Sequence, residues 1–214
     1  GHVGKIVLTL RGPEIRPDRA YLVTGGLGGL GPPVAGRLAA LGAKTVVLAG
    51  RSEPPPEELR TLVPAGVRLE TVRCDVADPA AVETLVARFG RDLPLLAGVF
   101  HLAAVLDDGV LLKEDPTRTA RVLAPKVDGA WNLHRATAAL ALDHFVLFAS
   151  SAGALGNAGQ SSYAAANAWL DAFASHRRAL GLPAIAIDWG PWAEVGRAAE
   201  IGGRSWEERG VRPL

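Results

Sequence analysis

Short apolar runs alternate with amphipathic stretches along most of this 214-residue chain. The apolar runs predict buried strands, which cover residues 20–23, 45–49, 67–72, 95–100, 145–149 and 184–187. The stretches between them carry apolar residues at helical spacing. Strands that alternate with helices in this way predict an α/β fold, a doubly wound parallel sheet with helices on both faces.

Two of the predicted helices have features that bear on the later argument. In the first, Val34, Leu38 and Leu41 recur at i, i+4 and i+7, which predicts one core-facing stripe. A later helix is expected to begin at Asp115 and to be interrupted at Pro125, because proline lacks the N–H that a helix interior needs.

The ends of the chain differ from its middle. A strand is predicted over residues 5–10, and a polar, proline-bearing link then marks a boundary, so residues 1–18 are expected to be a linker and strand. The α/β domain is expected to occupy residues 19–214. Because the last residues have little periodicity and no closing strand or helix, the chain is expected to be cut from a longer protein.

Composition and charge exclude several classes of protein. The 49% hydrophobic and 21% charged residues suit a globular domain. The net charge is +1 and the positive residues are scattered along the chain, so nucleic-acid binding has no electrostatic support. Cys74 is the one cysteine, which rules out an internal disulfide, and no Cys/His cluster has zinc-ligand spacing. No apolar run approaches the length of a membrane span. A cytoplasmic protein without a metal site is expected.

A glycine-rich segment lies between the first strand and the first helix. It reads Thr24-Gly25-Gly26-Leu27-Gly28-Gly29-Leu30-Gly31. Missing side chains let a backbone turn tightly and bring its amides close to a pyrophosphate. A generic tight turn would explain two glycines, but five glycines between a strand and a helix predict a dinucleotide site.

The residues after the second and third strands bear on the choice of dinucleotide. Arg51 and Ser52 follow the second strand, where proteins that prefer NAD usually place a carboxylate. Because an arginine pairs with the 2′-phosphate of NADP, Arg51 favours NADPH, although a solvent-exposed arginine near Glu53 is the alternative. Asp75 and Val76 follow the third strand, where Asp75 either reaches the adenine ring or caps the next turn.

The segment after the fifth strand carries candidate chemistry. Ser150 would leave a buried strand at its carboxyl end, where open α/β sheets keep their ligand crevice, and Tyr163 and Asn167 lie four apart on one helix face. A phenol becomes a useful proton donor near neutral pH only if a nearby cation stabilises its phenolate. Lys126 is the candidate cation, although most lysines lie on the surface.

The segment after the fourth strand supplies the remaining candidates. Ala103 and Ala104 are small enough to let a cofactor lie close to the backbone. Asp107 and Asp108 follow them and are expected at the mouth of the crevice.

Together these motifs resemble those of the ketoreductase domains of modular polyketide synthases, in the short-chain dehydrogenase/reductase superfamily. The motifs are the glycine turn at 24–31, Gly50-Arg51-Ser52, Leu106-Asp107-Asp108, Lys126-Val127-Asp128-Gly129, Ser150, and Tyr163-Ala164-Ala165-Ala166-Asn167. Ordinary members of the superfamily place lysine four residues after the tyrosine. Here that position is Asn167 and the lysine is Lys126, an exchange typical of polyketide and fatty acid synthase ketoreductases.

The resemblance implies a role for each of four residues. Tyr163 would protonate the developing alkoxide, Ser150 would hydrogen-bond the substrate carbonyl, Lys126 would lower the pKa of the phenol and hold the nicotinamide ribose, and Asn167 would support the proton relay. The implied reaction is NADPH-dependent reduction of the β-keto group of an acyl chain tethered to acyl carrier protein.

The resemblance also predicts stereochemistry. Leu106-Asp107-Asp108 looks like the motif of B-type domains, which give the D (3R) hydroxyl, and Leu155 stands where A-type domains carry tryptophan. Ala165 replaces the proline expected of B-type domains that select an L-configured 2-methyl group, which favours the D-configured form.

The first residues resemble the end of an enoylreductase domain. The resemblance therefore implies that the enoylreductase and the structural subdomain of the ketoreductase are partners in the same synthase. Two other functions stay open at this point: a catalytically silent scaffold domain, and a free-standing short-chain dehydrogenase acting on a small alcohol.

Overall fold

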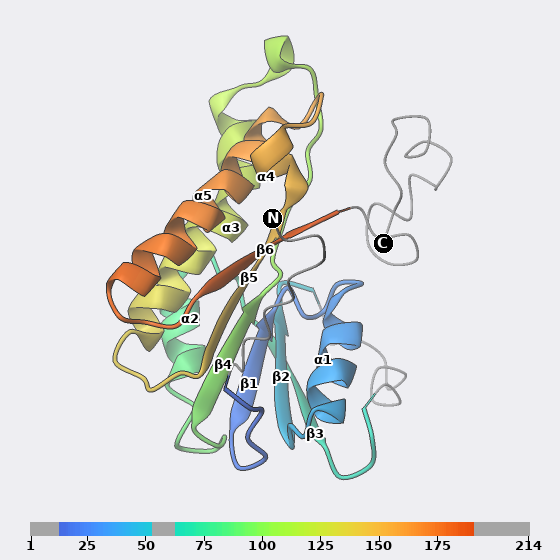
Figure 1. Ribbon diagram of the computed structural model, residues 1–214. Helices are drawn as coiled ribbons and strands as arrows, with labels where there is room; N and C mark the ends of the chain where they lie inside the picture. The colour runs from blue at the N-terminus through green and yellow to red at the C-terminus, as the bar shows by residue number, and fades with distance from the viewer. Residues whose placement is uncertain (1–12, 53–62, 191–214) are drawn as a thin grey trace, which may run out of the picture.

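One parallel sheet forms the centre of the molecule (Figure 1). The computed structural model describes residues 13–52 and 63–190, so the strand predicted at 5–10 and the tail from residue 191 lie outside the described residues. Within this part of the chain the sheet has six strands in the order β3-β2-β1-β4-β5-β6. The strands are β1 (Ala20–Thr24), β2 (Thr45–Gly50), β3 (Arg68–Arg73), β4 (Leu96–His101), β5 (His144–Ser150) and β6 (Ile185–Trp189).

The predicted fold class is confirmed. Every neighbouring pair of strands is parallel, and the strand order is that of a Rossmann-like doubly wound sheet. The order reverses between β1 and β4, because the chain first builds outward through β2 and β3 and then returns to the other side of β1. Ligands of such sheets bind outside the carboxyl ends of the strands at this point.

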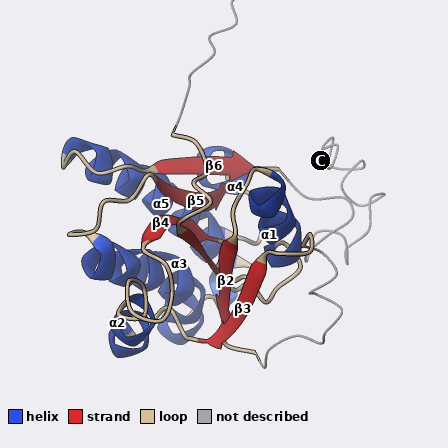
Figure 2. Cartoon of the chain, turned by 90° about the horizontal axis from the view of Figure 1, so that it is seen from below, coloured by secondary structure: helices blue, strands red, loops and turns tan. Residues whose placement is uncertain are grey.

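Helices cover both faces of the sheet (Figure 2). Helix α1 (Gly31–Ala40) packs on one face, and α2 (Pro79–Val86), α3 (Pro116–Thr137) and α5 (Ser161–Ala179) pack on the other. The short helix α4 (Ser151–Leu155) and a 3₁₀ turn, η2 (Leu111–Lys113), follow β5 and β4 at the carboxyl edge. Each face has its own apolar cluster, with Leu38 of α1 in one and Leu133 and Leu170 of α3 and α5 in the other.

The prediction that the apolar stripe of the first helix extends to Leu41 is wrong. Leu41 lies just beyond α1 and is 49% exposed. The buried residues of α1 are Gly31, Ala35, Leu38 and Ala39. The helix ends early because Gly42 takes a φ of +110°, a backbone conformation that an α-helix does not contain.

The break expected at Pro125 is also wrong, since α3 runs without interruption from Pro116 to Thr137. A proline inside a helix removes one N–H bond and crowds the preceding turn, but it need not end a helix that is held by packing. Pro125 is buried, and its neighbours Val122 and Lys126 are buried with it. Burial of this part of α3 outweighs the local cost and carries the helix past the proline.

No helix among the described residues is long and apolar enough to cross a membrane. The same residues contain no group of three His, Cys, Asp or Glu side chains placed to hold a metal ion.

Candidate active site

The glycine turn fits tightly between the ends of neighbouring strands. A Cβ atom added to Gly25 would lie 2.6 Å from the backbone nitrogen of Ala103, and one added to Gly26 would lie 2.5 Å from the carbonyl oxygen of Val23. At Gly31 the added atom would lie 1.8 Å from the carbonyl oxygen of Gly26. Larger residues at these positions would therefore push the turn away from the strand β1 and the segment after β4.

The outer part of the turn suits a bound pyrophosphate. Gly28 and Gly29 are exposed, and a Cβ atom at Gly28 would meet only the carbonyl oxygen of Gly25, at 3.3 Å. Helix α1 starts without a side-chain cap and without an acidic residue in its first turn. A helix end of this kind, next to an open glycine backbone, leaves space and a favourable dipole for a phosphate group.

The other residues predicted to hold the dinucleotide lie at the same edge. Arg51 and Ser52 directly follow β2 and are exposed. Asp75 accepts a hydrogen bond from the backbone N–H of Ala77 (3.0 Å), so its side chain caps the turn after β3. Its neighbour Val76 is buried. The adenine contact of Asp75 remains a prediction, and the turn-capping alternative describes what the carboxylate does in this structure.

The two alanines predicted next to the cofactor differ in exposure. Ala103 packs against the core, while Ala104 is exposed at the carboxyl edge. The backbone N–H of Leu102 donates to the carbonyl of Thr24 (2.8 Å), which ties this segment to the start of the glycine turn.

The side chains of Ser150 and Asn167 both lie close enough to the Tyr163 phenol to influence its pKa. Ser150 is the last residue of β5 and caps α4, because its Oγ accepts from the N–H of Ala152 (3.3 Å). Tyr163 lies in the first turn of α5, and the Asn167 Nδ2 donates to the Tyr163 carbonyl (2.7 Å) one turn later. The Oδ1 atom of Asn167 is buried without a hydrogen-bond partner, so this site still has one acceptor to offer.

Lys126 is buried rather than solvated. Only 2% of the residue is exposed, and its Nζ donates to the carbonyl of Phe148 in β5 (2.8 Å). The same nitrogen lies 5.6 Å from the centroid of the Tyr163 ring. Helix α3 therefore brings the predicted cation to the phenol carried by α5, although the two residues are far apart in the sequence.

The electrostatics of the pair follow from its burial. Burial lowers the pKa of Lys126 to about 7, and the carboxylate of Asp171 opposes that shift. Burial also raises the pKa of the Tyr163 phenol, while the Ser150 and Asn167 side chains act in the opposite direction. The lysine is thus a group that can change its charge near neutral pH, placed next to a phenol that is protonated there.

The Leu106-Asp107-Asp108 segment is held by ion pairs and hydrogen bonds. Asp107 pairs with Arg118 (2.9 Å) and with Arg121, both on α3, and these two arginines lower its pKa to about 2. Asp108 accepts from the Gln160 side chain at 3.1 and 3.0 Å. Leu106 is half-buried beside them. The two carboxylates thus tie this loop to α3 and to the start of α5.

Sequence reasoning missed one buried polar pair at this edge. The Nδ1 atom of His101 lies 2.7 Å from the Thr24 Oγ1, and both residues are buried. Burial, followed by the nearby charge of Lys126, lowers the pKa of His101 to about 3. The signal available in the sequence was a polar residue at the end of each of two apolar strands.

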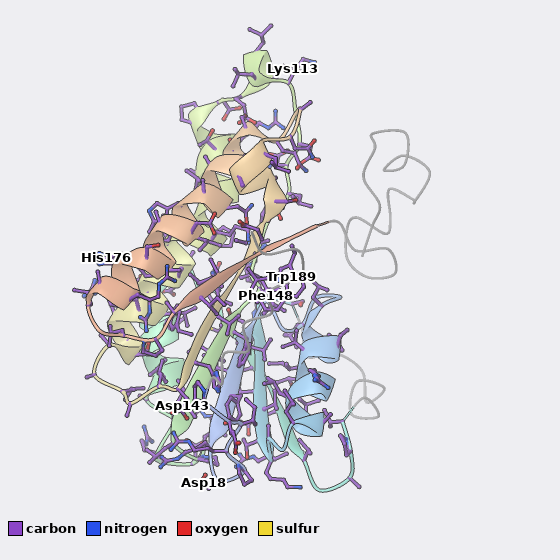
Figure 3. All side chains as sticks on the ribbon, viewed as in Figure 1. Asp18, Lys113, Asp143, Phe148, His176 and Trp189 are labelled. Carbon is purple, nitrogen blue, oxygen red and sulfur yellow. The ribbon has the colours of Figure 1, made fainter. Side chains whose placement is uncertain are left out.

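Four labelled residues show where the site lies along the molecule (Figure 3). Lys113, which ends the 3₁₀ turn after the loop, is at the far end from Asp18, which precedes β1. Phe148, whose carbonyl binds Lys126, and Trp189, at the end of β6, lie together between them, with ring centroids 5.4 Å apart.

The combined arrangement offers two hydroxyl donors and a lysine to a polar substrate group. The Ser150 hydroxyl interacts with the Tyr163 phenol, and the buried Lys126 lies against the Tyr163 ring. Hydroxyl donors of this kind stabilise negative charge that develops on a substrate oxygen.

Comparison with known proteins identifies the family of this chain. A model of the KR domain family matches residues 19–194. The chain is 44% identical over 213 residues to a component of the phenolphthiocerol/phthiocerol polyketide synthase of Mycobacterium tuberculosis, covering 92% of this chain and 10% of that protein. It is 49% identical over 206 residues to the spectinabilin polyketide synthase system protein NorB of Streptomyces orinoci, covering 92% of this chain and 9% of that protein.

A solved structure agrees with these relatives. An A-type ketoreductase from a modular polyketide synthase superposes with a TM-score of 0.80 at 44% identity, covering 86% of this chain and 40% of that one. The chain thus spans about a tenth of the curated relatives that it matches.

Proposed function

This chain belongs to the KR domain family of ketoreductases, and on that premise we propose that it is an NADPH-dependent β-ketoacyl reductase. Its substrate is a β-ketoacyl chain tethered to acyl carrier protein, and its product is the β-hydroxyacyl thioester. The observation that carries the proposal is the convergence on Tyr163 of side chains from β5, α3 and α5. They are Ser150, Lys126 and Asn167.

The side chains of this site match the charge changes of ketone reduction. When bound, NADPH supplies the hydride. As the keto carbon is reduced its oxygen gains negative charge, so the hydroxyls of Ser150 and Tyr163 stabilise the transition state more than the ground state. Tyr163 then gives its proton to the alkoxide, and the Lys126 ammonium beside the ring stabilises the phenolate that remains.

The preference for NADPH rests on Arg51. The residue directly follows β2 and is exposed at the carboxyl edge, where its guanidinium can pair with a 2′-phosphate in two parallel hydrogen bonds. Asp75 is proposed only as a contact of the adenine ring, and its carboxylate already accepts from the N–H of Ala77.

We further propose B-type stereochemistry and a place within a synthase. Leu106-Asp107-Asp108 and the exposed Leu155 favour the D (3R) hydroxyl, and Ala165 favours a D-configured 2-methyl group where one is present. The proposed partners are acyl carrier protein, the structural subdomain of the ketoreductase and an enoylreductase of the same synthase. The place within a synthase is supported by the relatives, which are themselves named as polyketide synthases.

The direct test is NADPH consumption with a β-ketoacyl thioester. Tyr163→Phe removes the proton donor and is expected to lower kcat by at least about 100-fold. The matched control is Tyr21→Phe, which changes the other tyrosine of the chain; its hydroxyl accepts from the N–H of Arg16 (2.6 Å), far from the site. NADPH binding without turnover would instead favour a silent scaffold domain, and equal use of NADH would contradict the role given to Arg51.

A further inference from the structure

Arg118, at the start of α3, is enclosed by the loop that carries Asp107 and Asp108. Its Nε and Nη2 atoms donate to the two carboxylate oxygens of Asp107 at 3.1 and 2.9 Å. Nη2 also donates to the carbonyls of Asp107 and Asp108, each at 3.2 Å, and Nη1 donates to the carbonyl of Lys113 (3.1 Å). One guanidinium thus holds both ends of the 107–113 segment.

Gly109 shows that the loop is shaped around this guanidinium. A Cβ atom added to Gly109 would lie 2.7 Å from Nη2 and 2.8 Å from Nη1 of Arg118. A side chain at this position would therefore have to displace the end of the Arg118 side chain. The side chain of Arg118 is 23% exposed, whereas that of Arg121, the second partner of Asp107, is 60% exposed. Arg118 is thus the inner of the two arginines.

The other side of the loop contacts the segment that leads into α5. The N–H of Gly109 donates to the carbonyl of Gly159 (2.8 Å), and the Gln160 side chain donates to both carboxylate oxygens of Asp108. The Asn157 side chain orients Gln160 by donating to its Oε1 (2.8 Å). Tyr163 follows Gln160 within one helical turn, and the charge of Asp108 is near enough to contribute to the raised pKa of its phenol.

We infer that Arg118 is a positioning residue which, by holding the 107–109 loop against the start of α5, sets the side from which the acyl chain approaches Tyr163. The keto oxygen must lie within reach of Ser150 and Tyr163, so the two substituents of the keto carbon can exchange places only if the space beside the phenol allows it. The loop contacts Gly159 and Gln160, which shortly precede Tyr163 in the chain, and so lies near that space. This inference rests on the proposed ketoreductase function and adds to it a residue that controls product configuration.

The test compares product configuration and kinetics for the full chain and its Arg118→Gln variant, with NADPH and a diffusible β-ketoacyl thioester. We expect the ratio of major to minor enantiomer to fall by about tenfold and KM to rise by about fivefold, while kcat changes by less than about threefold, because a misplaced loop affects binding geometry more than proton transfer. Arg118→Lys keeps the charge but loses the forked contact, so an intermediate fall is expected.

A matched control comes from a similar ion cluster elsewhere. Glu70 on β3 is held by Arg68 (2.6 Å) and Arg88, as Asp107 is held by two arginines, but it lies on a strand at the far edge of the sheet. Arg88→Gln is expected to leave the enantiomer ratio unchanged. Gln160→Ala attacks the loop from the α5 side and is expected to lower the ratio as Arg118→Gln does.

The outcomes separate the inference from the function on which it rests. If the unmodified chain forms no hydroxyacyl product, the proposed function fails and the inference fails with it. If that chain reduces the ketone while folded Arg118→Gln keeps the original enantiomer ratio and KM, only the inference is overturned. Should Arg118→Gln not fold, an unchanged ratio in both Arg118→Lys and Gln160→Ala overturns it equally.

Discussion

The glycines of the turn after β1 differ in what surrounds them. At Gly25, Gly26 and Gly31 an added Cβ would lie 2.6 Å or less from backbone atoms of the protein itself. At Gly28 the nearest atom would be 3.3 Å away, and the residue is exposed. The first group is therefore required by the fold, whereas Gly28 is free to serve a ligand.

This difference can be measured with two alanine substitutions. Gly31→Ala places a methyl group 1.8 Å from the Gly26 carbonyl oxygen and is expected to lower the free energy of unfolding by about 3 kcal/mol. Gly28→Ala is expected to change stability by less than about 1 kcal/mol but to weaken NADPH binding, because the methyl group occupies space beside the proposed pyrophosphate. Urea unfolding and fluorescence titration with NADPH would report the two effects. Equal destabilisation by both changes would contradict the distinction.

At the scale of elements, α5 presents a row of polar side chains toward Lys126 of α3. Tyr163, Asn167 and Asp171 are four residues apart and so lie on one helix face. The carboxylate of Asp171 favours the charged form of Lys126, while burial of the lysine favours the neutral form. The helix thus supplies both the phenol and a carboxylate that partly offsets the effect of burial on the pKa of Lys126.

Removal of the Asp171 charge should move the pH range of activity. Reduction needs the protonated lysine, whose pKa is about 7, so kcat/KM is expected to fall as the pH rises above about 7. In Asp171→Asn the opposing charge is absent, and this fall is expected at lower pH. Glu83→Gln, on the exposed face of α2, is the control and should leave the profile unchanged. A shift to higher pH in Asp171→Asn would contradict the electrostatic argument.

Elements with a strong local signal could be predicted from the sequence. All six described strands lie within two residues of their predicted positions, because apolar runs between polar or glycine-bearing segments are a local feature. The predicted break at Pro125 is wrong because packing holds α3 together through the proline. The predicted burial of Leu41 is wrong because α1 ends one residue before it, next to Gly42.

Only those residues of the site that belong to family motifs could be predicted from the sequence. Lys126 had no local feature that distinguished it from a surface lysine, and its burial depends on how α3 crosses β5. Arg118 and Gln160 could not be identified at all, since each acquires its partner from a segment distant in the sequence. The pairing of His101 with Thr24 depends likewise on β1 and β4 being neighbours in the sheet.

At the scale of the whole molecule, the contact between Thr24 and His101 joins β1 and β4, the two strands between which the order of the sheet reverses. Thr24 is the last residue of β1 and His101 is the last residue of β4. Their side chains meet in the interior, at the carboxyl edge of the sheet. A buried imidazole that receives a proton must lose its hydration and face the charge of Lys126. Protonation of His101 is therefore unfavourable in the folded chain.

The cost of protonating His101 in the folded chain predicts how stability changes with pH. The pKa of His101 is about 3 in the folded chain against an ordinary 6.5, so between these values the unfolded chain binds more protons, and the free energy of unfolding falls as the pH falls from about 6.5 toward 3. The contribution of this residue is at most about 1.4 kcal/mol per pH unit. Burial lowers the pKa of His134 and His144 as well, so they add to the slope.

His101→Asn should therefore make the decline shallower without removing it. Urea unfolding between pH 7.5 and about 4.5 would measure the slope, since carboxylates titrate mainly below that range. The variant is expected to be less stable than the original chain at about pH 7.5, because a smaller side chain leaves a cavity, and to lose less stability on acidification. His176→Asn, which changes an exposed histidine of α5, is the control (Figure 3). Identical slopes for His101→Asn and the original chain would show that the imidazole does not stay neutral in the folded protein.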